Sequence, residues 1–498
     1  MLAGPVPADP VPADPVSADP VQRELEALLA DVASAARDVT RRLRDRSSQL
    51  APQPGRAEAR DRATTTVECS LATMPHLLDH GVVLQRVGWP DPADRFPVVP
   101  ITGLLELMAA AATALRPGAV VVGFADVRTR RWLVACPPTL VVLHAEGAGP
   151  RQVVVAVDGY ATGTVLLAEW WPPPLAPAGQ GRLAGAVPAP VTADRLYRER
   201  WMFHGPAFAA VSELSEVGDD GIRGVLTVTG SPGALLDGVG QLIGHWVQVR
   251  QTADRIVFPV AIDEVRRFGP EPPAGTRVAC TARITELTAT GLRADAVLTT
   301  GPGEVLATVT GWTKRRFSTN AATWALRTTP STALLAQPQP DGSFIALEEW
   351  SDTATRELVV RAYLPAAERA EHDRQPTARQ RPWLLARIAA KDAVRHDLRQ
   401  RGLGALHPAE VTATDAGPGR LRLTAPSGEE TTLTIEHSGP ASAPQARARP
   451  LPDQLPDQFH DQLHDQLRQT QEDRHDFGDR RSPAAVRGGG HDAGRGHG

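Results

Sequence analysis

The sequence has few cysteines and no long uncharged apolar stretch. Its three cysteines, Cys69, Cys136 and Cys280, lie far apart, whereas zinc sites and redox dithiols need cysteines at short paired spacing. No segment runs long enough without charge to cross a bilayer, and the first residues lack the basic and apolar regions of a signal peptide. We therefore expect reduced core thiols in a cytoplasmic protein with no membrane partner.

The chain also lacks an excess of either charge. It has 498 residues, of which 53 are basic and 57 acidic, so its formal net charge is −4. Lysine is scarce and arginine abundant, and the two signs are interspersed along the sequence. Because no single-sign face is available to attract a polyanion, we expect no nucleic-acid partner, and a small or carrier-borne substrate fits better.

What the sequence does contain is a repeated unit in its centre. Helix-like apolar patterns occur at residues 104–115 and 234–249. Each is accompanied by segments typical of strands, at 81–84, 119–128, 139–146, 152–157 and 162–169 in the first unit and at 255–262, 277–287, 292–299 and 305–313 in the second. Each unit is too small to bury its helix well alone, so two units gain stability by pairing their sheets edge to edge. The pattern predicts an α+β double hotdog, two antiparallel sheets each wrapping a central helix, with halves at 65–185 and 186–318.

Other segments flank this repeat. Residues 1–20 repeat a Val-Pro-Ala-Asp-Pro unit that blocks helix formation, and 21–64 contain an amphipathic helix pattern and a linker. After a linker at 319–345, residues 346–440 show helical and then strand-like patterns, which predict a small α+β domain. The low-complexity residues 441–498 cannot form a packed core, so we expect both ends of the chain to be disordered.

Two residues in the repeat suit proton transfer. His80 can be neutral near pH 7, as a general base must be. Asp237 lies in an otherwise apolar helix pattern, where burial is expected to raise its pKa and make it a proton donor. Gln241 is four residues further on the same helix face, where its amide can hold either a substrate hydroxyl or the carboxylate.

Several stretches around these residues resemble the dehydratase domain of iterative type I polyketide synthases, including the enediyne and polyunsaturated-fatty-acid types. They are LLDHGVV, GWPDPADRFPVVP before the helix LLELMAAAA, RERWMFHGPAF, LLDGVGQLIGHWV and GWTKRRF, and the resemblance covers roughly half of the chain. It implies that His80 is the base and Asp237 the acid that convert a 3-hydroxyacyl thioester on an acyl carrier protein to a trans-2-enoyl thioester. No cofactor is implied for dehydration, because phosphopantetheine is part of the substrate, and the implied partner is an acyl carrier protein or polyketide synthase.

The resemblance also implies substrate-binding residues. The segment that lines the family's acyl tunnel and the proline beside the catalytic histidine match Phe203, His204, Gly205, Pro206, Phe208 and Pro100. The sequence departs from the family where Leu84 replaces a glycine and an insertion separates His80 from Pro100. Gly103 and Gly88 are therefore alternative backbone donors to the thioester oxygen.

A different class of function remains open, namely a catalytically silent double hotdog that serves as a docking or product-template module. A second resemblance, at TARQRPWLLARIAAKDAVRH and HPAEVTATDAGPGRLRL, is to part of an Sfp-type phosphopantetheinyl transferase. It implies Asp392 as a weak candidate Mg²⁺ ligand and Lys391 as its catalytic neighbour, with Mg²⁺ needed only if this domain is active. The family's remaining acidic ligands are missing, so we expect a truncated, inactive domain and no other metal site.

Overall fold

The computed structural model describes residues 61–174, 181–301, 303–439 and 444–450. The repeat predicted at 1–20, the helix expected after it and the low-complexity residues from 451 onward lie outside the described residues. Residues 445–450, which we expected to be disordered, instead form a strand that pairs with two neighbours. Among the helices of the described residues, none combines the length and the apolarity that crossing a lipid bilayer requires.

The first half of the double hotdog wraps one helix, α2 (Ile101–Leu115), in a curved antiparallel sheet. The strands, in spatial order, are β1 (Arg62–Cys69), β5 (Thr139–Gly147), β6 (Gln152–Val157), β7 (Ala161–Ala168) and β3 (Val120–Thr129). Buried residues alternate along these strands, as in β7, so one face of the sheet covers the helix. Residues 81–84, which we expected to be a strand, contribute only an isolated bridge between Gly81 and Pro97.

The second half repeats this arrangement around α4 (Ala234–Arg250), which is buried along almost its whole length. Its strands, in spatial order, are β11 (Ile256–Arg267), β14 (Glu304–Phe317), β13 (Gly291–Thr300), β12 (Arg277–Leu287), β10 (Gly221–Thr227), β9 (Val211–Val217) and β8 (Val187–Pro188). The short helix α3 (Ala193–Arg198) packs beside β9. Strands β1, β9 and β10 are absent from the sequence-based prediction because polar residues interrupt their apolar pattern.

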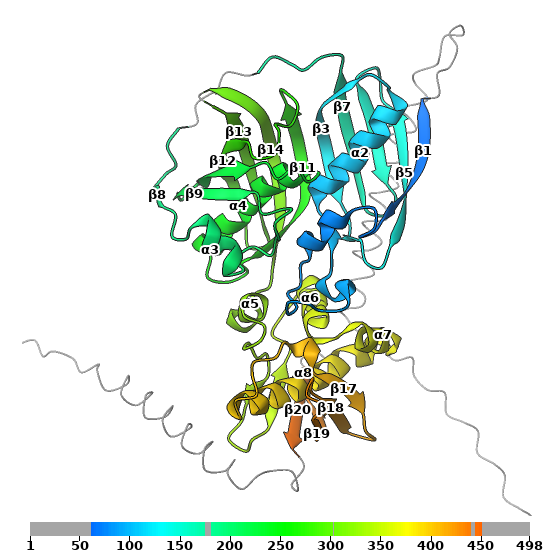
Figure 1. Cartoon of the computed structure of the whole chain (residues 1–498), viewed down its shortest axis with the longest axis vertical. Coiled ribbons are helices and arrows are strands. Elements are labelled where there is room, and N and C mark those ends of the chain that lie inside the picture. The colour runs from blue at the N-terminus through cyan, green and yellow to red at the C-terminus, as the bar shows by residue number, and fades with distance from the viewer. Residues whose placement is uncertain (1–60, 175–180, 302, 440–443, 451–498) are drawn as a thin grey trace, which may run out of the picture. The chain divides into compact units, whose positions relative to one another are not determined.

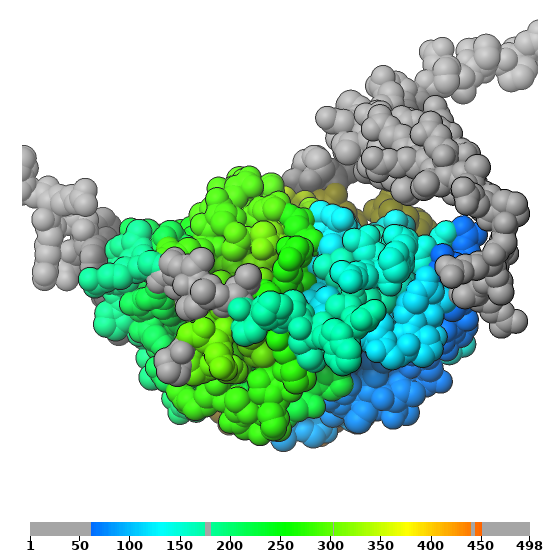
Figure 2. Space-filling model, turned by 90° about the horizontal axis from the view of Figure 1, so that it is seen from above, coloured from blue at the N-terminus to red at the C-terminus, as the bar shows by residue number. Residues whose placement is uncertain are grey.

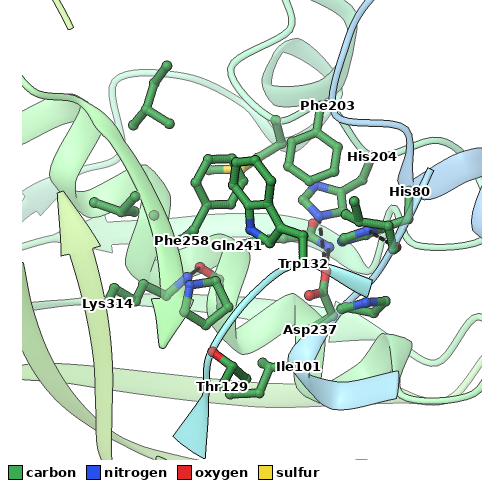
Figure 3. A pocket seen from close by; sticks show the side chains of 18 of the residues that line it. His80, Ile101, Thr129, Trp132, Phe203, His204, Asp237, Gln241, Phe258 and Lys314 are labelled. Atoms are coloured by element: carbon green, nitrogen blue, oxygen red, sulfur yellow. Dashed lines mark hydrogen bonds and ion pairs between the residues drawn. The ribbon is translucent and has the colours of Figure 1, made fainter. Parts of the chain in front are cut away.

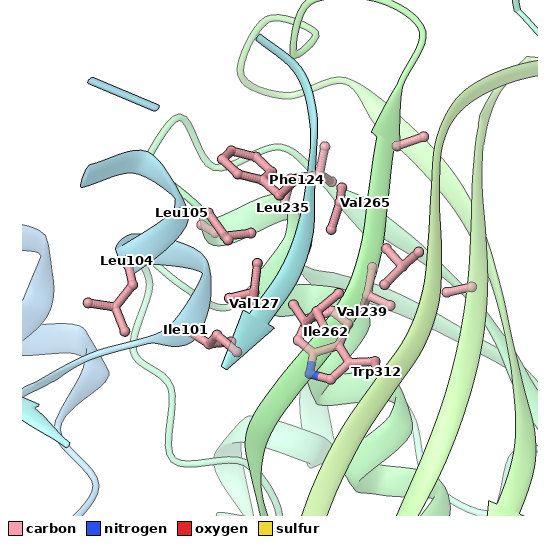
Figure 4. Close-up of a cluster of buried hydrophobic side chains, with 14 of the residues drawn as sticks. Ile101, Leu104, Leu105, Phe124, Val127, Leu235, Val239, Ile262, Val265 and Trp312 are labelled. Carbon is pink, nitrogen blue, oxygen red and sulfur yellow. The ribbon is translucent and has the colours of Figure 1, made fainter. Parts of the chain in front are cut away.

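The halves join through antiparallel pairing of β3 with β11, where Arg128 lies opposite Ala261, to form one twelve-stranded sheet. The double hotdog is therefore confirmed, and Figures 1 and 2 show its halves side by side. Gly123 is required at this seam because a Cβ there would lie 2.1 Å from the Val265 carbonyl oxygen. Apolar side chains from both helices and both seam strands fill the space between the halves (Figure 4), and each large one stabilises the fold by about 1.5–3 kcal/mol.

The remaining residues form a second sheet with helices. Its strands, in spatial order, are β15 (Gln337–Pro338), β16 (Phe344–Leu347), β20 (Gln445–Pro450), β19 (Glu430–Ser438), β18 (Arg420–Thr424) and β17 (Thr412–Asp415). The helices are α5 (Ala321–Thr328), α6 (Thr353–Tyr363), α7 (Ala366–Arg374) and α8 (Thr377–Gln400), and α8 packs on this sheet. Short elements elsewhere are η1 (Pro75–His80), η2 (Pro92–Arg95), β2 (Val98–Val99), β4 (Leu133–Val134) and η3 (Pro408–Glu410).

Candidate active site

His80 is the last residue of η1 and is almost fully buried, with 6% of its surface exposed. Its Nδ1 lies 2.8 Å from the Val98 carbonyl oxygen. A carbonyl oxygen only accepts hydrogen bonds, so Nδ1 carries the proton and the Nε2 lone pair remains free. Phe203 and Phe208 each hold the imidazole ring at a centroid distance of 5.0 Å. The ring is thus fixed in the tautomer that a general base requires.

Asp237 lies in the first turn of α4 and is 7% exposed. Gln241 donates from Nε2 to the Asp237 carboxylate over 2.9 Å and to the Phe208 carbonyl over 2.7 Å. Tyr197 donates its hydroxyl hydrogen to Gln241 Oε1 over 2.6 Å. The sequence left open whether Gln241 holds a substrate hydroxyl or the Asp237 carboxylate, and these contacts favour the carboxylate. Tyr197 is a part of this site that the sequence did not indicate.

His204 forms an ion pair with Asp237, with its Nε2 3.0 Å from the carboxylate Oδ2. The loop that carries His204 is anchored by Asp79, the neighbour of His80 in sequence. The Asp79 backbone carbonyl accepts from Gly205 N–H over 2.7 Å, and its carboxylate accepts from Ala207 N–H over 2.8 Å. One residue of the first half thereby positions a loop of the second half. Sequence spacing could not show this, because the two partners are far apart along the chain.

The pKa values of the two central residues follow from burial and mutual charge. Burial lowers the pKa of His80 to about 4, although the nearby Asp237 carboxylate opposes this shift. For Asp237, burial raises the pKa, but the charge and hydrogen bond of His204, together with His80 and Gln241, leave it below its ordinary value. The expectation of a raised Asp237 pKa was wrong, because the sequence did not reveal the pairing with His204.

These side chains line one pocket, which has apolar as well as polar residues in its wall. Figure 3 shows His80, His204 and Asp237 together on one side of it. One ligating atom of each of these three residues lies within 4.8 Å of the others. His80 comes from the first half of the fold and Asp237 from the second, so the pocket lies where the halves meet.

Not all of the predicted binding residues line this pocket. Pro100, Phe203 and His204 do, but Gly205, Pro206 and Phe208 are absent from its lining. Phe208 is fully buried behind the His80 ring, where it supports the base. Gly103 was proposed as a backbone donor but is also absent from the lining, and Gly88, the alternative, is exposed. Ile101 and Leu104, which flank this position in the first turn of α2, do line the pocket.

His80, His204 and Asp237 are close enough to share one metal ion, since histidine nitrogens and a carboxylate suit transition metals. The same pocket, however, is lined by Lys314, which is buried, and by Arg327. Their positive charges oppose a divalent cation. The electrostatics of the pocket thus favour proton transfer over metal binding.

The predicted metal ligand of the C-terminal domain, Asp392, is fully buried and already has partners. Its carboxylate accepts hydrogen bonds from Arg395 over 2.6 Å, from the Tyr363 hydroxyl and from two backbone N–H groups. Lys391 is likewise engaged, by Glu368 over 2.9 Å and by a backbone carbonyl. The suggestion of Asp392 as a Mg²⁺ ligand is therefore corrected, because both residues stabilise the domain interior.

A histidine and a carboxylate that face one pocket define a site suited to acid–base chemistry. Residues 175–323, which include Asp237, match the family model described as polyketide synthase dehydratase N-terminal domain. The chain is also 25% identical over 269 residues to phenolphthiocerol/phthiocerol polyketide synthase subunits C and D of Mycobacterium tuberculosis. That alignment covers 50% of this chain and 14% of each relative, so the chain spans only a small part of their length.

Two solved structures resemble the fold. One is the dehydratase domain of a mycocerosic acid synthase-like polyketide synthase, 20% identical with a TM-score of 0.39 over 54% of this chain and 94% of that one. The other is the dehydratase domain from the CurJ module of curacin polyketide synthase, 18% identical with a TM-score of 0.41 over 53% and 95%. Residues 175–323, which contain the second half of the double hotdog, are thus similar to a polyketide synthase dehydratase domain, and the curated relatives are polyketide synthase subunits. These similarities give no support to the transferase resemblance of residues 346–440.

Proposed function

We propose that the double hotdog removes water from a 3-hydroxyacyl thioester carried by an acyl carrier protein, giving a trans-2-enoyl thioester. The observation that carries this proposal is the meeting of His80 and Asp237, from opposite halves of the fold, in one buried pocket. The two groups have different hydrogen-bond partners, since His80 is held through Nδ1 with Nε2 free, whereas the Asp237 carboxylate pairs with His204. Separate environments allow one group to accept a proton while the other donates one.

The reaction begins when His80 Nε2 takes the proton from the α-carbon. The electron pair of that C–H bond forms the new α,β double bond, and the bond from the β-carbon to its hydroxyl oxygen breaks. Asp237, which receives its proton from His204, protonates the departing hydroxyl so that it leaves as water. The proton left on His80 then returns to the pair formed by His204 and Asp237. This path is short, because the nearest side-chain nitrogen and oxygen atoms of the three residues lie within 4.8 Å of one another.

The substrate and partner follow from this chemistry and from the relatives. The apolar side chains of Ile101, Val257 and Phe258 in the pocket wall suit an acyl chain. The curated relatives are polyketide synthase subunits, which supports a phosphopantetheine-borne substrate supplied by a polyketide synthase or its acyl carrier protein. The phosphopantetheine arm belongs to the substrate, and the residues that transfer protons need no cofactor. We propose no transferase activity for the C-terminal domain.

The test is mass spectrometry of a 3-hydroxyacyl acyl carrier protein incubated with the full chain. The expected result is a loss of water with the wild type and a rate reduced by about 10²–10⁴-fold in His80→Ala and Asp237→Asn. His144→Ala is the matched control, because His144 is an exposed histidine on the outer side of β5. Equal turnover, or equal inactivity, of wild type and both variants would favour the silent docking module.

A further inference from the structure

Lys314 is an ionisable residue of the same pocket that has no part in the proposed dehydration. It lies on β14 and is 4% exposed, although lysine side chains are rarely buried. It is also one of only two lysines among the 53 basic residues of the chain. The other, Lys391, forms an ion pair with a carboxylate of its own, whereas no ion pair involving Lys314 occurs within the described residues.

The contacts of Lys314 explain why this basic residue is a lysine. Its Nζ donates to the Gly240 carbonyl oxygen over 2.7 Å and lies 5.5 Å from the centre of the Trp312 ring. A Cβ at Gly240 would lie 3.3 Å from Nζ and 3.2 Å from the Trp312 ring. An ammonium group is more compact than a planar guanidinium, which suits the narrow space that Gly240 leaves beside the Trp312 ring. Gly240 supplies both the room and the one acceptor.

An ammonium group has three N–H donors, and Gly240 is the only acceptor that Lys314 has among the described residues. Pro259, which lies opposite Lys314 in the pairing of β11 with β14, offers no acceptor from its side chain, and neither do Val257 and Phe258 of the same pocket. Asp237 attracts the charge without a hydrogen bond, and burial lowers the pKa of Lys314 to about 8. Burying a cation with unfilled donors is costly. A ligand that brings an acceptor into the pocket would remove this cost.

We propose that Lys314 forms a subsite for an oxygen atom on the acyl chain of the substrate, beyond the carbons at which water is eliminated. Figure 3 shows Lys314 on the opposite side of the pocket from His80, and both residues line the same cavity. A chain bound with its β-carbon between His80 and Asp237 then extends toward the ammonium. The substrate class is an oxygenated polyketide chain rather than a saturated fatty acyl chain. This inference rests on the dehydratase function proposed above.

The experiment compares acyl pantetheine thioesters of one chain length with the full-length protein. One member is a saturated 3-hydroxyacyl thioester, a series carries a single keto oxygen moved stepwise along the distal chain, and one member ends in a carboxylate. We expect one oxygenated member to exceed the saturated one in kcat/KM by about tenfold or more, as a hydrogen bond to a charged group allows. Comparison of the keto series with the carboxylate member shows whether the Lys314 subsite prefers a neutral oxygen or an anion.

Lys314→Met removes the donors and keeps the length of the side chain. We expect it to abolish the preference, so that the ratio of kcat/KM between the oxygenated and the saturated member falls to about one. Arg315→Met is the matched control, because Arg315 follows in the same strand with an exposed side chain, and we expect it to keep the preference. Equal kcat/KM for all members with the wild type overturns the subsite even if Lys314→Met does not fold.

Failure of the subsite and failure of the dehydratase are distinguishable. Turnover of the saturated thioester alone would overturn the subsite and leave the dehydratase standing. If no thioester loses water, the dehydratase fails, and the subsite is judged by the affinity of unreactive amide analogues of the same panel. Tighter binding of an oxygenated analogue to wild type than to Lys314→Met supports the subsite, and equal binding overturns it.

Discussion

His204 is paired with Asp237 inside the acid–base pocket, with 3.0 Å between the imidazole Nε2 and the carboxylate Oδ2. The ring is stacked on Phe203 at a centroid distance of 4.0 Å, so it has little freedom to turn away. This pairing decides the ionisation of Asp237, because burial alone would raise the pKa of the carboxyl group and His204 reverses the shift. Three groups rather than two therefore control protons in this site.

Replacing His204 with phenylalanine should raise the pKa of Asp237, because burial persists while the charge and hydrogen bond of His204 are lost. An infrared titration of the carboxyl band that disappears in Asp237→Asn measures this shift. We also expect kcat to fall by about 10–100-fold, since the relay to the leaving hydroxyl is broken. A variant with unchanged kcat and an unchanged Asp237 titration would show that His204 only lines the pocket.

The pH dependence of kcat/KM should report the titration of His80. Its pKa is lowered to about 4, so the imidazole is neutral above that pH and loses its free lone pair as the pH falls through it. The acid limb of the profile is therefore expected near pH 4, well below the 6.5 of an ordinary histidine. A limb at or above 6.5 would mean that a different group is the base.

Tyr197 is expected to act through Gln241 rather than on the substrate. Its hydroxyl donates to Gln241 over 2.6 Å and accepts from Val211 N–H over 2.9 Å. Tyr197→Phe should lower the free energy of unfolding by about 1–3 kcal/mol, because it leaves these partners without their hydrogen bonds. Denaturant unfolding measures this loss, and kcat should fall more than KM rises. Tyr160→Phe is the control, because Tyr160 is the other tyrosine of the double hotdog and lies away from Gln241. An equal effect of both substitutions would deny Tyr197 a positioning role.

Stability should fall in mild acid because of His245, which is fully buried in α4. Burial lowers its pKa from 6.5 to about 4. Between these values the unfolded chain binds a proton that the folded chain does not, so the free energy of unfolding decreases as the pH falls from 6.5 to 4. The slope from one such group is at most about 1.4 kcal/mol per pH unit. His245→Phe should flatten the dependence measured by thermal unfolding, and an unaltered slope would contradict the assignment.

The C-terminal domain should be insensitive to metal. Asp392→Ala leaves Arg395 buried without its carboxylate partner, so we expect a loss of about 3–5 kcal/mol in unfolding free energy. Addition or chelation of Mg²⁺ should leave the thermal midpoint unchanged. We also expect no transfer of phosphopantetheine from coenzyme A to an apo carrier protein. Metal-dependent stabilisation that disappears in Asp392→Ala would restore this residue as a ligand.

Much of the fold could be predicted from apolar periodicity. The two central helices are recognisable because their burial requires long apolar patterns, and the structure extends them only slightly, to Ile101–Leu115 and Ala234–Arg250. Strands β1 and β9 were missed because polar residues interrupt their apolar pattern, and β1 lies at an edge of the sheet where few of its residues are buried. Residues 445–450 were missed because they were grouped with the low-complexity sequence that follows them, whereas pairing with β16 and β19 makes them a strand.

The sequence by itself determined the kinds of chemical group available, since an imidazole at residue 80 and a carboxyl in an apolar helix stand out without coordinates. Only the tertiary structure decided how those groups behave. The pKa of Asp237 depends on His204, and the orientation of the His204 loop depends on Asp79. Likewise, only the packing of β14 on α4 shows that the Lys314 ammonium group has the Gly240 carbonyl oxygen as its one acceptor among the described residues. The physical reason is that electrostatic interactions depend on distances in space, which the order of residues along the chain does not specify.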